Sequence, residues 1–282
     1  MIGSIISGEN AFLILLAVVW LVGAILQDLH RREVDNLWNF SLIGFALAYR
    51  LAVSGYTGNY WFFVNGLIGF VIFLALGNLF YYCRLFAGGD AKLVIALGAI
   101  LPLSYSWIIN IEIFGLFILG FLVGGSVYVF IWSLFLAFTN MKNFIKEYKK
   151  QAKDYKHYFS WSLIFVLFFG FLLYFSDPSL ALSSLVFLLF PVLFVFARSV
   201  EEVCMVKKVE ISKLTVGDWL YEDLYVRGKK IKKNWEGLSE MDLKLIKEKY
   251  SRKVMVKYGV PFTPSFLIGF LFVLYLSYIG WF

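Results

Sequence analysis

The chain has 282 residues, of which 61% are hydrophobic and 20% aromatic, and its mean hydropathy is +0.77. Soluble globular domains average about half apolar residues or fewer, so this composition excludes a soluble globule. The formal net charge is +7. Because no basic helix or groove stands apart from the membrane flanks, this charge does not indicate nucleic-acid binding.

Apolar stretches close to the ~20 residues that cross a bilayer recur along the chain. They predict about eight transmembrane helices, at 10–27, 37–54, 60–82, 91–109, 111–139, 160–176, 179–198 and 263–282. The first ten residues have no basic region, and no small-residue cleavage site follows them. We therefore expect the first stretch to be a retained span and not a signal peptide.

The positive residues predict the orientation. If the N-terminus lies outside, the cytoplasmic segments are 28–36, 83–92, 140–159 and 198–262, and these hold 25 of the 26 lysine and arginine residues. Only Arg50 falls towards the outer side. Loops rich in positive charge face the cytoplasm, so the sequence predicts a multi-pass protein of the cytoplasmic membrane that also attracts anionic lipids.

Residues 1–198 are expected to form a transmembrane domain, interrupted at 140–159 by a basic amphipathic cytoplasmic loop. Residues 199–261 are polar and are expected to form a small cytoplasmic domain, and 262–282 a C-terminal transmembrane helix. The predicted fold class is an all-α polytopic membrane protein with a small α+β cytoplasmic domain before the last helix.

Within the polar domain, residues 208–214 alternate like a strand, and residues 216–218 indicate a turn. Ser239, with Asp242 three residues later, resembles a capping box that begins a helix. A second strand is predicted at 254–256. No catalytic constellation is visible in this domain.

Two carboxylates, Asp28 and Asp90, end or begin otherwise apolar stretches, and both fall on the predicted cytoplasmic side. Ionisable groups at such positions are energetically expensive, so a functional role is the default interpretation. Two carboxylates that share one proton can hydrolyse a peptide bond, one activating a water and the other donating to the scissile carbonyl. The loops beside them also carry Glu33 and Asp35, which are more simply solvated loop charges.

Simpler roles remain open for these residues. Asp90 could cap the fourth helix, Asp28 could pair with Arg31 or Arg32, and Lys92 could extend its amine to the membrane surface. Cysteine and histidine are too few and too scattered to form a metal site. A metal held by Asp28 and Asp90 would lack the usual nitrogen ligands, so we expect no metal and no cofactor.

The motif from Asp28 to Asn36 (DLHRREVDN), followed by Gly88-Gly89-Asp90-Ala91-Lys92, resembles the aspartyl prepilin peptidases of the Gly-x-Gly-Asp intramembrane protease class. Asp28 and Asp90 match the two catalytic aspartates of that family, and Lys92 matches its lysine two positions after the second. The resemblance covers roughly residues 10–140. The Val-Pro-Phe-Thr-Pro-Ser segment before the last helix is similar to an archaeal subgroup that handles pilins or archaellins.

The chain departs from the family pattern in three places. Ala87 stands at the first glycine of Gly-x-Gly-Asp, and Asp35 stands where bacterial members have proline. The tetracysteine insert of the bacterial members is missing, which puts their second, N-methyltransferase activity in doubt.

The resemblance implies an aspartic endopeptidase that removes a short basic leader from prepilin-like or preflagellin precursors at the cytoplasmic membrane face. Asp28 and Asp90 would be catalytic, and Gly88, Gly89, Lys92, Glu33 and Asp35 would support the site or bind substrate. One alternative is a proton-coupled transporter with Asp28 and Asp90 as its proton relay, and another is an assembly-platform protein that needs neither aspartate.

Overall fold

The computed structural model describes residues 5–226 and 228–281. The chain divides into two compact units, one formed by residues 1–130 with 261–282 and the other by residues 131–260. The division falls inside one long helix.

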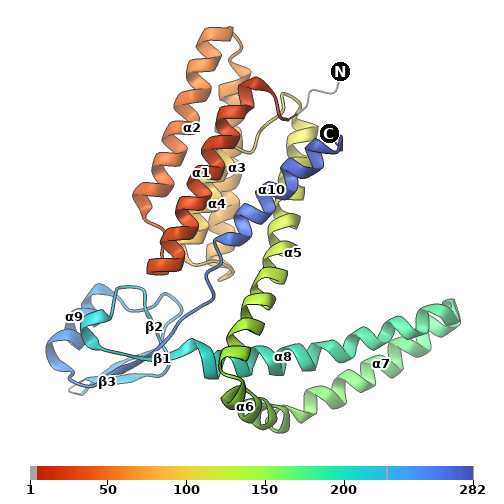
Figure 1. Ribbon diagram of the computed structural model, residues 1–282, viewed down its shortest axis with the longest axis vertical. Coiled ribbons are helices and arrows are strands. Elements are labelled where there is room, and N and C mark those ends of the chain that lie inside the picture. Colours follow the sequence, from red (N-terminus) through yellow and green to blue (C-terminus); the bar gives the residue numbers. More distant parts are fainter. Residues whose placement is uncertain (1–4, 227, 282) are drawn as a thin grey trace. The chain divides into compact units, whose positions relative to one another are not determined.

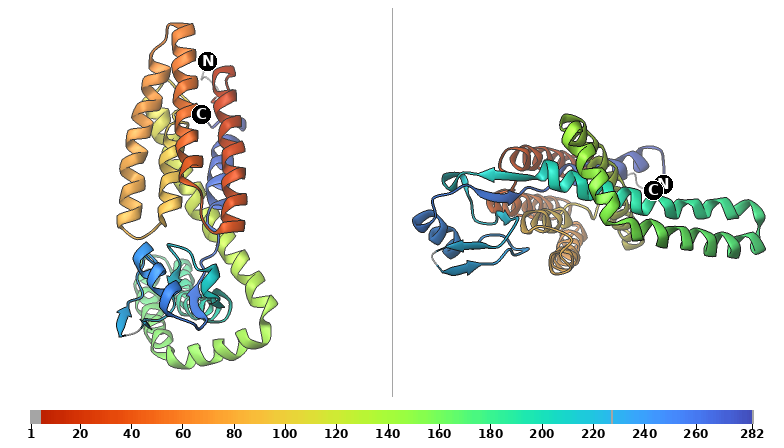
Figure 2. Two further views of the ribbon diagram at one scale, coloured as in Figure 1. Left: turned by 90° about the vertical axis from the view of Figure 1, so that its left-hand side faces the viewer. Right: turned by 90° about the horizontal axis from the view of Figure 1, so that it is seen from below.

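Within the described residues, six helices build the first unit, and one of them, α5, contributes only its first part. They are α1 (Gly8–Arg31), α2 (Asn36–Thr57), α3 (Trp61–Tyr82), α4 (Gly88–Gly98), α5 (Trp107–Thr139) and α10 (Pro264–Tyr278), with α5 continuing into the second unit. Helices α1 to α4 run side by side, and α10 lies along α1 although more than 200 residues separate them in sequence (Figures 1 and 2). Contacts between helices this far apart make one helical bundle from the two ends of the chain.

Buried aromatic side chains join α3, α5 and α10 in the core of this unit. Phe73 contacts Phe117 with ring centroids 6.1 Å apart, and Phe121 contacts Phe266 at 5.5 Å. All four side chains are fully buried. Burying a phenylalanine side chain stabilises a fold by roughly 1.5–3 kcal/mol in water, and inside a bilayer the same rings contribute mainly through close packing.

Six helical segments are long and apolar enough to cross a membrane in the part of the chain that the structure describes. They are Gly8–Arg31, Asn36–Thr57, Trp61–Tyr82, Trp107–Thr139, Lys156–Ser176 and Pro178–Met205. The predicted fold class is confirmed as mainly helical with a small sheet, but the predicted number of about eight spans is not. Two predicted spans are short helices: α4 has 11 residues and α10 has 15.

The fourth predicted span, 91–109, is wrong because α4 ends at Gly98 and the chain stays non-helical until Trp107. The guanidinium of Arg50, on α2, binds the carbonyl oxygens that this ending leaves unpaired. It donates to Ala99 at 2.9 Å, to Ile100 at 3.0 Å and to Pro102 at 2.7 Å.

Arg50 is fully buried and makes a fourth hydrogen bond, 2.8 Å long, to the carbonyl of Phe62, whose ring lies 4.6 Å from the guanidinium carbon. Non-helical backbone at membrane depth is tolerated only where protein or water satisfies its polar groups. Arg50 supplies that satisfaction, and α4 can therefore end early.

The second unit begins with the end of α5 and continues through a helical hairpin. Its segments are α6 (Met141–Asp154), α7 (Lys156–Ser176), a 3-10 helix (Pro178–Leu188), α8 (Leu189–Val200) and a π-helical turn (Glu201–Met205). Helix α6 is the predicted basic amphipathic segment, and its Phe144 packs on Phe196 of α8 with ring centroids 5.6 Å apart. Helix α7 and the segment that returns through α8 run side by side (Figures 1 and 2).

A small α+β domain completes the second unit. Strands β1 (Val206–Val209), β5 (Val254–Lys257) and β2 (Trp219–Leu220) form an antiparallel sheet in the order β1-β5-β2, and β3 (Leu224–Val226) pairs with β4 (Lys229–Ile231). The strand predicted at 254–256 and the helix begun by Ser239 are confirmed, the latter as α9 (Glu240–Lys249). The strand predicted at 208–214 is largely wrong, because β1 ends at Val209 and a 3-10 turn covers Ile211–Lys213.

Arg50→Met should destabilise the first unit strongly. The variant keeps the apolar stem but leaves four buried carbonyl groups without their donor, and an unsatisfied buried acceptor costs about 1–3 kcal/mol. Denaturation of the detergent-solubilised protein measures the loss. Arg31→Met is the matched control, since Arg31 makes an exposed ion pair with Asp35. Equal stability of the two variants would show that the Arg50 hydrogen bonds do not stabilise α4.

Candidate active site

Asp28 lies in the last turn of α1 and is buried, with 8% of its surface exposed. Its Oδ2 accepts two hydrogen bonds from Thr263, one from the hydroxyl at 2.7 Å and one from the backbone N–H at 3.2 Å. The apolar run that ends at Gln27 explains why this segment is a helix. The next residue, Asp28, is buried, and its carboxylate is hydrogen-bonded to a residue near the other end of the chain.

Thr263 is itself fully buried and is the N-cap residue of α10, followed by Pro264. The first N–H groups of a helix have no partner within it, and the helix dipole favours negative charge there. The Asp28 carboxylate thus satisfies the amide at the start of α10. Asp28 is therefore hydrogen-bonded to Thr263 and does not form the ion pair with Arg31 that a simpler interpretation assigned to it. The Arg31 guanidinium instead contacts Asp35 at 3.6 Å.

Asp90 lies in the first turn of α4 and is half-buried. The N-cap of α4 is Ala87, in an extended conformation that alanine adopts readily, and the helix start has no side-chain capping bond. Asp90 is therefore not the helix cap that a simpler interpretation assigned to it. Neither Gly88 nor Gly89 has a positive φ.

The chain segments that carry Asp28 and Asp90 meet at the same end of the first unit. Phe86, four residues before Asp90, contacts Phe262, the neighbour of Thr263, with ring centroids 5.9 Å apart. The charge of Asp28 also acts electrostatically on Asp90. Figure 1 shows the end of α1 and the starts of α4 and α10 together at this end of the bundle.

The loop between α1 and α2 closes against the start of α4. The Nζ of Lys92 donates a 2.6 Å hydrogen bond to the side-chain oxygen of Asn36. A Cβ placed on Gly89 would lie 3.6 Å from the backbone nitrogen of Val34, an ordinary contact. Lys92 therefore holds the α1–α2 loop beside Asp90, which is a more specific role than reaching the membrane surface.

Glu33 and Asp35 are exposed on the same loop. Asp35 is partly neutralised by Arg31, and its backbone N–H donates to the side chain of Gln27 at 3.0 Å. These two carboxylates are brought to the end of the unit that carries Asp28 and Asp90, but on its solvated side. Within residues 5–226 and 228–281, no three histidine, cysteine, aspartate or glutamate residues are grouped so that they could hold a metal ion.

Sequence reasoning missed Thr263, the direct partner of Asp28. The available signal was a hydroxyl residue between Pro261 and Pro264 at the entry to an apolar helix.

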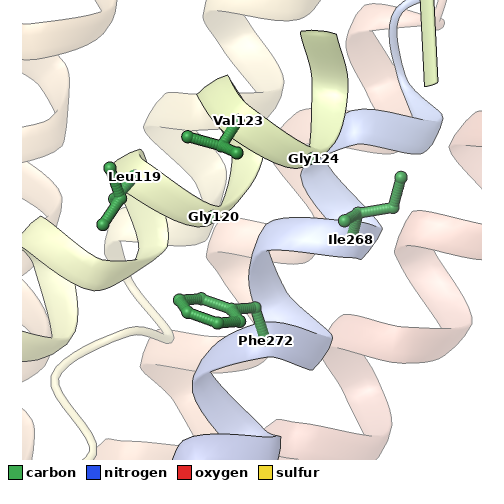
Figure 3. Close-up of a pocket in the computed structure, with 6 residues that line it drawn as sticks. All are labelled: Leu119, Gly120, Val123, Gly124, Ile268 and Phe272. Atoms are coloured by element: carbon green, nitrogen blue, oxygen red, sulfur yellow. The ribbon is translucent and has the colours of Figure 1, made fainter. Parts of the chain in front are cut away.

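A separate groove of about 290 Å³ lies between α5 and α10 (Figure 3). Its lining is entirely apolar and consists of Leu119, Gly120, Val123, Gly124, Ile268 and Phe272. Without a polar group it offers no chemistry, so the candidate active site is the pair of aspartates.

The fold and this site define a polytopic membrane protein with two aspartates gathered at the ends of its helices. Residues 15–141 match the type IV leader peptidase family, and the resemblance drawn from the aspartate motifs is thereby confirmed. The match includes both aspartates and ends before the polar domain.

Relatives with curated names lie in methanogenic archaea. The chain is 25% identical over 150 residues to a preflagellin peptidase of Methanococcus voltae, covering 50% of this chain and 62% of that protein. It is also 25% identical over 144 residues to a preflagellin peptidase of Methanocaldococcus jannaschii, covering 49% and 61%. The chain thus spans about three fifths of the length of these two relatives. No solved structure matches it.

Cysteines introduced by Asp28→Cys and Asp90→Cys should form a crosslink under mild oxidation, because the end of α1 and the start of α4 lie at the same end of the first unit. The measurement needs a background of Cys83→Ser and Cys204→Ala, since both native cysteines are free thiols. Catalytic contacts can tighten only when substrate binds, so the assay is run with and without a precursor peptide. Asp28→Cys with Glu112→Cys is the control pair. No crosslink at 28 and 90 under either condition would contradict the geometry.

Proposed function

We propose that the chain is a membrane-embedded aspartyl endopeptidase that removes leader peptides from type IV pilin-like or archaellin precursors. The observation that carries the proposal is the convergence of two aspartates, one buried and one half-buried, at one end of a helical membrane unit whose sequence matches leader peptidases. The names of the archaeal relatives support a preflagellin or prepilin precursor as the substrate.

The chemistry follows from the pair sharing one proton. The ionised carboxylate takes a proton from a water molecule as that water attacks the scissile carbonyl, while the protonated partner donates its proton to the developing oxyanion. As the C–N bond breaks, the carboxyl that took the proton from water gives it to the leaving amine, and the partner recovers a proton from the collapsing diol. Like-charge repulsion keeps both aspartates from being ionised together. The aspartates lie at the ends of α1 and α4, which favours this reaction over a proton relay at the membrane midplane.

The substrate position follows from peptide-bond accessibility. A carbonyl inside a helix is hydrogen-bonded and shielded from attack, so the scissile bond lies where the precursor unwinds before its apolar segment. The distribution of positive residues supports a cytoplasmic location for this end of the unit. We assign residues 199–261 to substrate docking or stability, without a chemical role.

Asp28→Asn and Asp90→Asn should each lower the rate of precursor cleavage by at least roughly 100-fold, because each removes one member of the acid–base pair. An asparagine oxygen at position 28 still accepts from Thr263, so this variant should stay folded. Cleavage of a purified precursor in detergent, followed by gel electrophoresis, measures the rates.

Glu33→Gln and Glu222→Gln are the matched controls for these variants. Both remove an exposed carboxylate, one beside the candidate site and one in the polar domain. Each should keep most of the activity, Glu33→Gln because Asp35 still supplies a carboxylate on the same loop. Normal turnover by either aspartate variant, or a comparable loss in Glu222→Gln, would show that the site is placed wrongly.

Reversal of the basic residue before the scissile bond to glutamate should slow cleavage by roughly 5- to 150-fold, the effect of losing one partly desolvated charged contact. Glu33 and Asp35 form the acidic rim that this residue would meet. The double variant Glu33→Lys, Asp35→Lys should partly restore cleavage of the reversed precursor. Equal cleavage of both precursors by the unmodified enzyme would refute recognition of a basic leader, and absent rescue would refute the role of the two rim carboxylates.

A further inference from the structure

The strongest unexplained contact in the first unit joins Asp28 to Thr263. Both donors of Thr263, the hydroxyl and the amide, reach the same carboxylate oxygen, Oδ2, at 2.7 and 3.2 Å. Thr263 lies outside residues 15–141, the part of the chain that matches the leader peptidase family. The proposed chemistry assigns no role to Thr263.

We propose that Thr263 is a positioning residue for Asp28. Its hydroxyl and amide hold Oδ2 and so fix the plane of the carboxylate, leaving Oδ1 to bind the attacking water. In the described residues Oδ1 accepts no hydrogen bond and is not fully enclosed. This inference rests on the proposed endopeptidase function, because only a reacting carboxylate needs its orientation fixed.

The two donors act through different parts of the residue. The amide belongs to the backbone at the start of α10 and is retained in every substitution at this position. The hydroxyl is a side-chain donor that a helix start does not require, because the amide alone already pairs with the carboxylate. Loss of the hydroxyl should therefore change the orientation of the Asp28 carboxylate, whereas the backbone amide should still join α10 to it.

A second hydroxyl two residues along provides an internal comparison. The Oγ of Ser265 is buried and has no hydrogen-bond partner in the part of the chain that the structure describes. Ser265 and Thr263 both lie at the start of α10 and are equally buried, and Thr263 is the one of the two that hydrogen-bonds to Asp28 in the described residues. Removal of the Ser265 hydroxyl therefore tests for nonspecific effects of changes in this turn.

The experiment compares Thr263→Val, Thr263→Ser and Ser265→Ala in the full-length protein, with a precursor as substrate and kcat and KM measured separately. Valine keeps the shape of threonine and the backbone amide but removes the hydroxyl, whereas serine keeps the hydroxyl. We expect Thr263→Val to lower kcat by roughly 10- to 150-fold with little change in KM, the effect of losing one hydrogen bond to a charged group. Thr263→Ser and Ser265→Ala should stay within a few-fold of the unmodified protein.

The outcomes separate this inference from the function on which it rests. If the unmodified protein does not cleave the precursor, the endopeptidase function fails. If it does cleave and Thr263→Val retains the kcat of Ser265→Ala, the positioning role of Thr263 is overturned while the function stands. A rise in KM without a fall in kcat also overturns it, since that pattern indicates a binding role.

Folding of the valine variant is checked by gel filtration in detergent. If Thr263→Val does not elute as the unmodified protein does, Thr263→Cys replaces it, because a thiol has similar size and is a weak donor. Its kcat should then lie between those of the serine variant and Asp28→Asn. A kcat equal to that of the serine variant would contradict the need for a strong donor.

Discussion

The guanidinium of Arg50 binds the carbonyl oxygens that α4 leaves unpaired where it stops. The hydrocarbon core of a bilayer offers no water that could hydrogen-bond to these carbonyl groups. A helix therefore normally continues, because its own hydrogen bonds are the only ones available. Arg50 removes that requirement at one place. Helix α4 can then be only 11 residues long, and Asp90 lies in its first turn, at the end of the first unit where α1 ends.

The two aspartates share one end of the unit but have different surroundings. Asp28 is buried, with both donors of Thr263 on one oxygen, and Asp90 is half-buried in the first turn of a helix that it does not cap. When two carboxyl groups have different surroundings, one of them can act as the base and the other as the acid. Helix α10 adds to the difference, because its positive end faces Asp28. The last helix is therefore part of the site's construction, although it follows the matched residues by more than 100 positions.

The two aspartates could be singled out as candidates from the sequence, because a charge that ends an apolar stretch is visible locally. The helices α1, α2, α3 and α5 could also be predicted, because each has an apolar run long enough to cross a membrane. It failed at 91–109, where the apolar run continues but the helix does not, because the cause is an arginine about 50 positions earlier in the chain. Thr263 was missed for a similar reason, since its partner is 235 residues away. A local sequence pattern shows whether a segment is apolar enough to enter the membrane. It does not show which segments pack together, and the contacts of Arg50 and Thr263 depend on that packing.

The proposed mechanism requires Asp28 and Asp90 to work as a pair that holds one proton. The pH dependence of kcat/KM for precursor cleavage tests it most directly. Below the lower apparent pKa of the pair neither aspartate is a base, and above the upper one neither is an acid, so the account predicts a bell-shaped profile. The same profile should appear in Glu33→Gln, which changes only an exposed neighbouring carboxylate. A rate that rises to a plateau and stays there at high pH would contradict a shared proton, and with it the mechanism.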